Sequence, residues 1–133
     1  MPNVPFNVLD LIPTRRVVVI DATTDRPDEL LIETWEQQIV ELKEKRVVFG
    51  RIPSLTDVCI PGRIVAKQLF EIRWNEERCR HEVEVYPCVY PPSLNGRPLI
   101  SGESNPLFIG DVLTIGPFRI DYTTWQDEQE VER

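Results

Sequence analysis

Hydrophobic and polar residues alternate with a period of two along the middle of the chain. In the stretch LFEIRW, the apolar residues Phe70, Ile72 and Trp74 share one face, and the charged residues share the other. The stretch CRHEVEVY alternates in the same way, with one set of side chains facing inward (Cys79, His81, Val83, Val85) and the other outward (Arg80, Glu82, Glu84). Because successive side chains of a strand point to opposite faces, the two stretches predict a β-hairpin joined by the loop NEER.

Short apolar runs between turn signals continue this pattern toward both ends of the chain. The β-branched run 17–20 and the stretch RVVFGR, residues 46–51, each predict a strand. GDVLTIGPFRIDYTT predicts two strands that meet at Gly116-Pro117 and place Phe118, Ile120 and Tyr122 on one face. Short strands with turn signals every 8–12 residues or so are typical of a β-sandwich or barrel.

Residues 30–42 carry two patterns at once. Leu31, Trp35, Ile39 and Leu42 fall at helical spacing. Residues 30–34 and 39–42 also fit two short strands around the turn WEQQ. Periodicity alone therefore leaves a helix and a pair of strands open for this segment.

Length and charge narrow the class of protein. A chain of 133 residues fits one domain, on a prior of roughly 100–200 residues per domain, and we predict a flexible arm at 1–14, a domain at 15–124 and an acidic tail at 125–133. The net charge of −7 argues against binding to nucleic acid, which requires a basic surface. No apolar stretch approaches the ~20 residues of a membrane span, and the N-terminus lacks the basic region of a signal peptide, so we predict a cytoplasmic protein without membrane insertion.

The cysteine and histidine content argues against a metal or cofactor site. The chain has three cysteines and one histidine, without a C-x-x-C pair or the four ligands of a zinc site. We predict free thiols, no metal and no cofactor.

A series of short motifs follows a fixed order between residues 30 and 122. Its members are Gly50-Arg51 at a strand end, the stretch DVCI at 57–60, Val65, Asn95-Gly96, Gly110-Asp111 and Ile115-Gly116. In this order and at this spacing, the chain resembles the forkhead-associated (FHA) domain, whose loops bind phosphothreonine. The resemblance implies an all-β sandwich of about ten or eleven short antiparallel and mixed strands, and it favours strands for residues 30–42.

The chain departs from the family at its binding positions. The family has Ser-x-x-His where this chain has Ala66 and Leu69, and Tyr90-Pro91 stands where the first of two Asn-Gly pairs is usual. Of the usual binding set only Arg51 is clearly kept. A phosphothreonine is bound through several charge-assisted donors, and each hydrogen bond to a charged group is worth roughly 1.5–3 kcal/mol, so we expect phosphate binding to be much weaker.

These departures lead to two hypotheses about function. The first is a non-catalytic protein-interaction or scaffold module, built on a degenerate FHA domain, that binds another protein largely independently of phosphothreonine and takes part in a larger assembly. The alternative is a phosphothreonine-binding protein in which Arg51 acts with Arg63 and Lys67 in a rearranged site. Arg97 completes a small basic patch, and Asn95 is a further candidate binding residue. These cations could equally be scattered surface charges, and Arg51 could serve to tie loops together.

A catalytic role is the third hypothesis, and the sequence argues against it. His81 is the single histidine and is predicted to pack in the core beside Val83. Cys79 lies two residues away on the same predicted strand, and such side chains are about 6–7 Å apart, whereas a thiol–imidazole pair needs roughly 3 Å. We therefore predict no catalytic residues.

The sequence also leaves two further features open. One is phosphorylation of Thr23 or Thr24, and the other is pairing of an exposed sheet edge between two copies of the chain.

Overall fold

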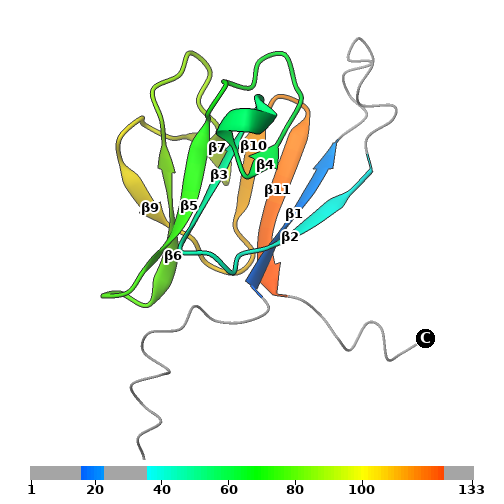
Figure 1. Ribbon diagram of the computed structural model, residues 1–133. Coiled ribbons are helices and arrows are strands. Elements are labelled where there is room, and N and C mark those ends of the chain that lie inside the picture. Colours follow the sequence, from blue (N-terminus) through cyan, green and yellow to red (C-terminus); the bar gives the residue numbers. More distant parts are fainter. Residues whose placement is uncertain (1–15, 23–35, 125–133) are drawn as a thin grey trace, which may run out of the picture.

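The computed structural model describes residues 16–22 and 36–124. Two β-sheets pack face to face and enclose one core (Figure 1). The predicted arm at 1–14, tail at 125–133, strand at 30–34 and the threonines 23 and 24 lie outside the described residues.

Eleven strands make up the two sheets of the described part. The first sheet has the order β2-β1-β11-β10-β7-β8, with β1 at Arg16–Ala22, β2 at Gln38–Glu41, β7 at Ser93–Leu94, β8 at Arg97–Pro98, β10 at Val112–Ile115 and β11 at Phe118–Thr124. The second has the order β4-β3-β5-β6-β9, with β3 at Arg46–Gly50, β4 at Val58–Cys59, β5 at Phe70–Asn75, β6 at Arg80–Val85 and β9 at Ser104–Pro106. A 3-10 helix, η1 at Pro53–Leu55, follows β3. Since β3 and β4 pair in parallel and the other pairs are antiparallel, the predicted mixed all-β sandwich is confirmed.

The inward faces of the strands form the core, as the alternating pattern predicts. Phe49 of β3 stacks on Phe70 of β5, with ring centroids 4.7 Å apart. The predicted inward faces of β5 and β11 are buried (Phe70, Ile72, Trp74, Phe118, Ile120, Tyr122). Each large apolar side chain buried in this way stabilises the fold by about 1.5–3 kcal/mol relative to its exposed state.

The hairpin of β5 and β6 is confirmed, but its turn is not where the pattern places it. Ile72 pairs with Val83 and Trp74 with His81. Cys79, predicted to face inward on the strand, is exposed and has a φ of +53°. The prediction for Cys79 is wrong because the turn ends with a residue in the left-handed region, which side-chain alternation does not reveal.

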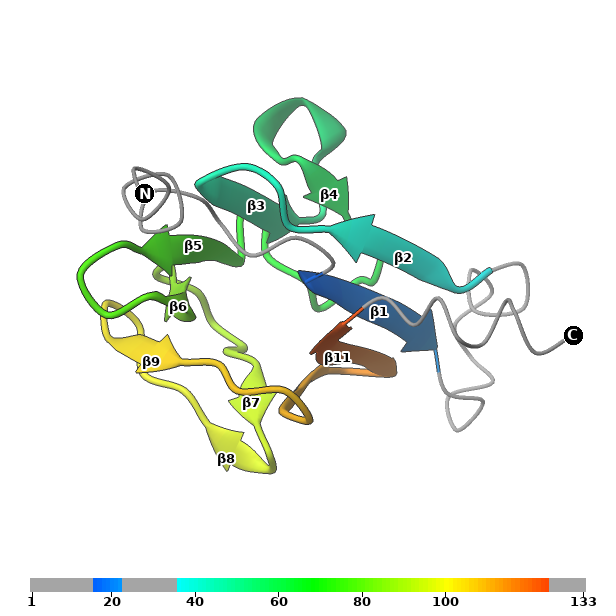
Figure 2. The same ribbon diagram turned by 90° about the horizontal axis from the view of Figure 1, so that it is seen from below.

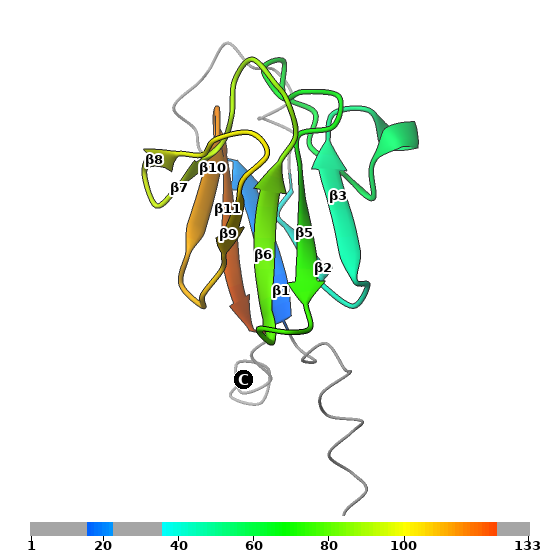
Figure 3. The ribbon, with the colours of Figure 1, turned by 90° about the vertical axis from the view of Figure 1, so that its left-hand side faces the viewer.

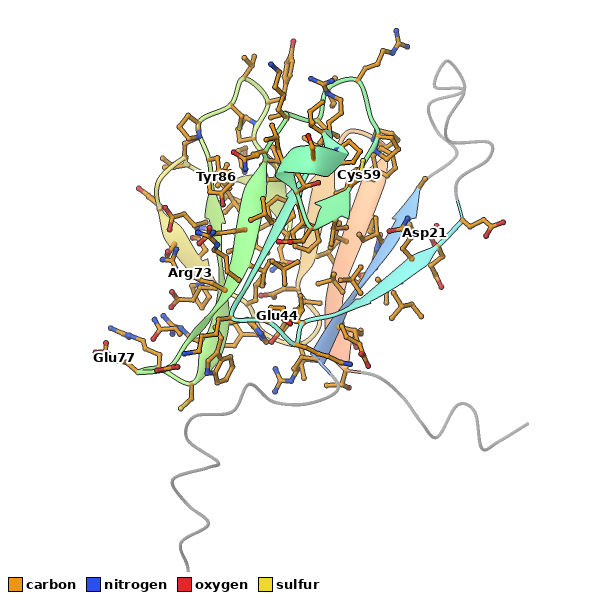
Figure 4. The ribbon with its side chains drawn as sticks, in the orientation of Figure 1. Asp21, Glu44, Cys59, Arg73, Glu77 and Tyr86 are labelled. Atoms are coloured by element: carbon orange, nitrogen blue, oxygen red, sulfur yellow. The ribbon has the colours of Figure 1, made fainter. Side chains whose placement is uncertain are left out.

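Charged residues on the outer face of the second sheet cover one another. Glu71 and Glu82 keep only 6% and 5% of their surface exposed, although the pattern places them on the solvent side. Arg73 donates to Glu71 at 2.9 Å and also bonds Glu84, and Arg80 donates to Glu82 at 2.9 Å. Figure 4 shows Arg73 on this face, below Tyr86. The arginine side chains therefore satisfy and shield the carboxylates that burial would otherwise penalise.

His81 is buried in the core at the end where β1 begins, as predicted for a packed histidine. Its exposed fraction is 1%, and its Nδ1 lies 2.7 Å from the hydroxyl of Tyr122. Arg16 donates to the same hydroxyl oxygen at 2.9 Å. Arginine only donates and a tyrosine hydroxyl oxygen has two lone pairs, so Tyr122 accepts from Arg16 and also forms a hydrogen bond with Nδ1 of His81. Burial, reinforced by the charge of Arg16, lowers the pKa of His81 to about 4.

The single histidine allows a direct test of this arrangement. The pKa in the folded chain lies below the unfolded value of about 6.5, so the stability that neutral His81 contributes is fully present above pH 6.5 and is lost as the pH falls toward 4. We expect the imidazole to titrate near pH 4 in a proton NMR titration. The group should also lower the free energy of unfolding by about 3 kcal/mol between pH 7 and pH 4, measured by urea denaturation.

The substitution His81→Gln provides the control. Glutamine keeps a hydrogen-bonding group for Tyr122 but does not titrate, so this part of the pH dependence should disappear while that of the carboxylates remains. An imidazole pKa near 6.5 in the folded chain would contradict the assignment.

Candidate functional site

Three loops gather at the end of the sandwich opposite the start of β1 (Figure 1). They are the β3–β4 loop at 51–57, the β4–β5 loop at 60–69 and the β6–β7 loop at 86–92. The backbone N–H of Tyr86 donates to the carbonyl of Leu69 at 2.9 Å and joins the last two loops. This loop end is where the family resemblance places peptide recognition.

The β4–β5 loop packs directly against the end of β3. A Cβ atom on Gly50 would lie 2.3 Å from the carbonyl oxygen of Lys67, so only glycine allows this approach. The backbone N–H of Arg51 donates to the carbonyls of Ala66 at 2.9 Å and Lys67 at 3.1 Å. The Gly50-Arg51 pair therefore fixes the position of the loop.

The side chain of Arg51 also binds this loop. Its Nε donates to the carbonyl of Val65 at 2.9 Å, and the residue is half-buried. Within the described part of the chain its guanidinium forms no ion pair. Arg51 thus ties the loop to β3, which supports the structural role weighed for it, while its terminal nitrogens remain able to donate to a ligand.

An open hollow of about 590 Å³ lies between the β4–β5 and β6–β7 loops. Its lining residues are Ala66, Lys67, Gln68, Tyr86 and Pro87. Lys67 is exposed and supplies a positive charge, whereas Ala66 is half-buried against the core and supplies no side-chain donor. The hollow therefore combines one cation with a mainly apolar wall.

The hydroxyl of Tyr86 is already occupied. It donates to Oε1 of Glu71 at 2.6 Å, and burial together with this bond raises the pKa of Tyr86 to about 12. Tyr86 therefore stays protonated at physiological pH, and its hydrogen stays on Glu71 rather than on a ligand in the hollow.

Exposed apolar side chains, called the apolar rim below, lie on the loops at this end of the sandwich. Leu55 of η1 is 46% exposed, and Val89 and Tyr90 of the β6–β7 loop are 81% and 56% exposed. The side-chain amide of Gln68 donates to the carbonyl of Leu55 at 2.9 Å and joins η1 to the β4–β5 loop. Tyr90 stands where the family usually has asparagine, so the loop presents an apolar ring in place of an amide.

Leu69 belongs to the core rather than to the loop surface. Its side chain is fully buried, and its N–H donates to the carbonyl of Phe49 at 2.7 Å. At this position, where the family has histidine, apolar packing and backbone hydrogen bonds hold the base of the β4–β5 loop.

The structure brings together only part of the predicted site. Arg51 and Lys67 lie at the same contact between β3 and the β4–β5 loop. Arg63 is exposed on that loop but does not line the hollow. Asn95 lies in the β7–β8 turn and Arg97 begins β8, and this hairpin lies on the side of the molecule away from η1 (Figure 3).

Asn95 fixes the β7–β8 turn to β10. Its φ is +52°, its Nδ2 donates to Oδ1 of Asp111 at 3.0 Å, and its Oδ1 accepts from the N–H of Val112 at 2.9 Å. Arg97 lines a separate hollow of about 200 Å³ that also contains Glu103.

Sequence reasoning missed Gln68, Tyr86 and Pro87, which line the hollow. A signal for two of them was present, because Tyr86 ends the alternating stretch and Pro87 follows it, which marks the point where the strand meets a loop. No group of three or more potential metal ligands gathers in the part of the chain that the structure describes. No helix of the described residues is long and apolar enough to span a membrane.

Neither a known family model nor a curated protein matches the sequence. Solved structures do match. The yeast splicing factor Pml1 superposes with a TM-score of 0.68 at 18% identity, covering 89% of this chain and 87% of that one. The FHA domain of CT664 from Chlamydia trachomatis gives a TM-score of 0.63 at 11% identity, covering 83% and 99%. A structure from work on phosphothreonine-dependent FHA domain interactions gives 0.61 at 17% identity, covering 83% and 98%.

The chain has the fold of a forkhead-associated domain. The TM-scores of 0.61–0.68 establish the shared FHA fold. At identities of 11–18% the ligand has to be argued from the residues of this chain. In this FHA fold the hollow beside Lys67 lies between the β4–β5 and β6–β7 loops.

The role of Asn95 can be tested by substitution. Asn95→Ala removes two side-chain hydrogen bonds and leaves a non-glycine residue with positive φ, so we expect the free energy of unfolding to fall by about 2 kcal/mol. Urea denaturation of the purified chain measures this change. The neighbouring exposed Arg97→Ala is the matched control and should stay within about 0.5 kcal/mol of the parent; equal stability of the two variants would contradict a structural role for Asn95.

Proposed function

We propose that this chain is a non-catalytic protein-interaction module that binds an unmodified segment of a partner protein at its loop end, largely independently of phosphothreonine. The observation that supports this most is the composition of the hollow. Ala66 stands at its wall without a side-chain donor, and the hydroxyl of Tyr86 is engaged by Glu71. Arg51 does not line the hollow, and its Nε is engaged by Val65.

A phosphate group would find few donors in this hollow. Phosphothreonine carries about −1.5 to −2 charges and three acceptor oxygens that need charge-assisted hydrogen bonds. Lys67 is the cation that lines the hollow, and Arg51 offers only the terminal nitrogens of its guanidinium. A point charge without a preorganised set of donors attracts anions in general and gives little preference for phosphate over carboxylate.

The apolar rim favours a partner that buries hydrophobic side chains. Val89, Tyr90 and Leu55 are exposed on the loops at the same end of the sandwich as the hollow. Burial of apolar surface contributes about 25 cal/mol per Å², and tyrosine is enriched among the residues that dominate protein interfaces. A segment with acidic residues near apolar ones would match both Lys67 and this rim.

Structures of the same fold are compatible with a role in an assembly. The structure of yeast Pml1 was described together with the integration of Pml1 into the RES complex. EmbR from Mycobacterium tuberculosis was solved with a low-affinity phosphopeptide. The fold thus serves both in assemblies and in phosphopeptide binding, and the residues at the hollow decide between them.

A phosphothreonine-binding site is the second candidate. The observation in its favour is that Lys67 lines the hollow and that its backbone carbonyl accepts a hydrogen bond from the N–H of Arg51, so the two residues are in backbone contact. Arg63, on the same loop, would be the third cation of such a rearranged site.

An amide NMR titration distinguishes the two candidates. The full chain is titrated with a degenerate phosphothreonine peptide pool and with the same pool unphosphorylated. We expect no phosphate-dependent shifts at Arg51, Arg63 and Lys67 at sub-millimolar peptide, because the hollow lacks the donors that a phosphate needs. Shifts at these amides that require the phosphate would contradict the proposal and support the second candidate.

A gain-of-function variant tests the physical reason. Ala66→Ser with Tyr90→Asn restores a hydroxyl and an amide at the two positions where the family has donors. Two such bonds contribute about 2–3 kcal/mol together, so phosphopeptide affinity should rise roughly 30- to 150-fold, measured by the same titration. Val89→Ser is the matched control, because it adds a hydroxyl to the same loop away from the family positions. An unchanged affinity in the double variant would show that missing donors are not the cause.

A further inference from the structure

The β9–β10 turn presents two large apolar side chains to solvent. Phe108 and Ile109 are adjacent in sequence and are 58% and 54% exposed. Turns at the surface usually carry polar residues, and contiguous exposed apolar surface is a feature of interaction sites.

Hydrogen bonds hold this turn in one conformation. The N–H of Asp111 donates to the carbonyl of Phe108 at 2.9 Å, and the carboxylate of Asp111 accepts from the N–H of Phe108 at 2.9 Å. Gly110, with a φ of +101°, donates to the carbonyl of Tyr122 at 2.9 Å. The two apolar side chains are therefore displayed on a fixed support, which lowers the entropy cost of covering them.

The turn lies at the end of the sandwich where the described chain begins. Arg16 pairs with Thr124, and its side chain donates to the hydroxyl of Tyr122, whose backbone carbonyl receives the N–H of Gly110. Figure 2 views this end and shows the start of β1, the end of β11 and the connection from β9 together. The described chain thus begins at the same end of the sandwich as Phe108 and Ile109, with β11 between β1 and the strand that follows the turn.

We propose that residues 4–12 pack in cis over Phe108 and Ile109. This segment is rich in apolar residues (Val4, Phe6, Val8, Leu9, Leu11, Ile12) and carries one charge, on Asp10. Residues 13–15 connect it to β1 and span at most about 10 Å when extended, which suits a surface next to the start of the strand. The short tether gives an effective concentration in the millimolar range, so modest apolar contact is sufficient for docking.

Geometry favours this surface over the loop end for the same segment. The loop end lies a full strand length away, and β11, a strand of seven residues, spans about 23 Å at ~3.3 Å per residue. An arm that ran to the loop end would use at least half of its residues to travel along the sandwich, whereas the β9–β10 turn leaves the whole apolar stretch available. This docking is independent of what the loop end binds.

The test compares two double variants of the full chain by amide NMR. Phe108→Ser with Ile109→Ser removes the apolar pair, and Val89→Ser with Tyr90→Ser removes a similar pair at the loop end. We expect the first variant to shift the amide resonances of residues 4–12 and to abolish their NOE contacts to the turn, and we expect the second to leave residues 4–12 unchanged. The single variant Ile109→Thr repeats the test with a smaller change should the first variant lose the dispersed core resonances.

Three outcomes would overturn the proposal. The resonances of residues 4–12 could be the same in the parent and in the Phe108/Ile109 variants, which would show that the segment does not contact the turn. They could respond to the Val89/Tyr90 variant instead, which would place the segment at the loop end. They could also shift with protein concentration, which would assign the surface to a second copy of the chain.

Discussion

The close backbone contact between Gly50 and the carbonyl of Lys67 determines the shape of the whole loop end. It draws the β4–β5 loop onto the last residue of β3, and the N–H of Arg51 then reaches the carbonyls of Ala66 and Lys67. Leu69 is brought into the core at the base of the loop, and Tyr86 is bound to it through the backbone. The hollow between the loops therefore follows from a contact made by main-chain atoms, which leaves the side chains around it free to differ.

The same bonds that order the loops also consume donors. The Nε of Arg51 binds Val65, the amide of Gln68 binds Leu55, and the hydroxyl of Tyr86 binds Glu71. Each bond reduces the freedom of a loop and so prepares the surface for a partner, but it also removes a group that could have bound a phosphate oxygen. The loops are therefore more rigid and have fewer free hydrogen-bond donors, which suits a ligand recognised by shape and apolar contact.

Sequence patterns predict the strands of this fold where side chains alternate. They fail where the local backbone conformation determines which way a side chain points. The period of two gives β5, β6, β10 and β11 and the inward position of His81, because burial on one face of a strand is visible in the residues themselves. It misplaces Cys79, since a left-handed turn residue leaves no mark in the alternation. Arg51 and Lys67, both predicted as site residues, meet at one backbone contact. The bonds of Asn95 to Asp111 and Val112, in contrast, depend on the tertiary pairing of β7 with β10. Tyr86 could be predicted at a strand end, while its bond to Glu71 required the register of the sheet.

The distribution of charge indicates which surfaces of this acidic protein are available to a charged partner. On the outer face of the second sheet, Arg73 and Arg80 are paired with buried or half-buried glutamates, so that face presents little net field. Lys67 lines the hollow at the loop end, where it faces solvent next to apolar side chains. At a net charge of −7 the protein as a whole repels anions at long range. A single local cation still attracts an anionic group within a Debye length of about 8 Å at physiological ionic strength. An acidic partner would therefore gain little from long-range steering, and its selection would depend on short-range contact with the hollow and its apolar rim.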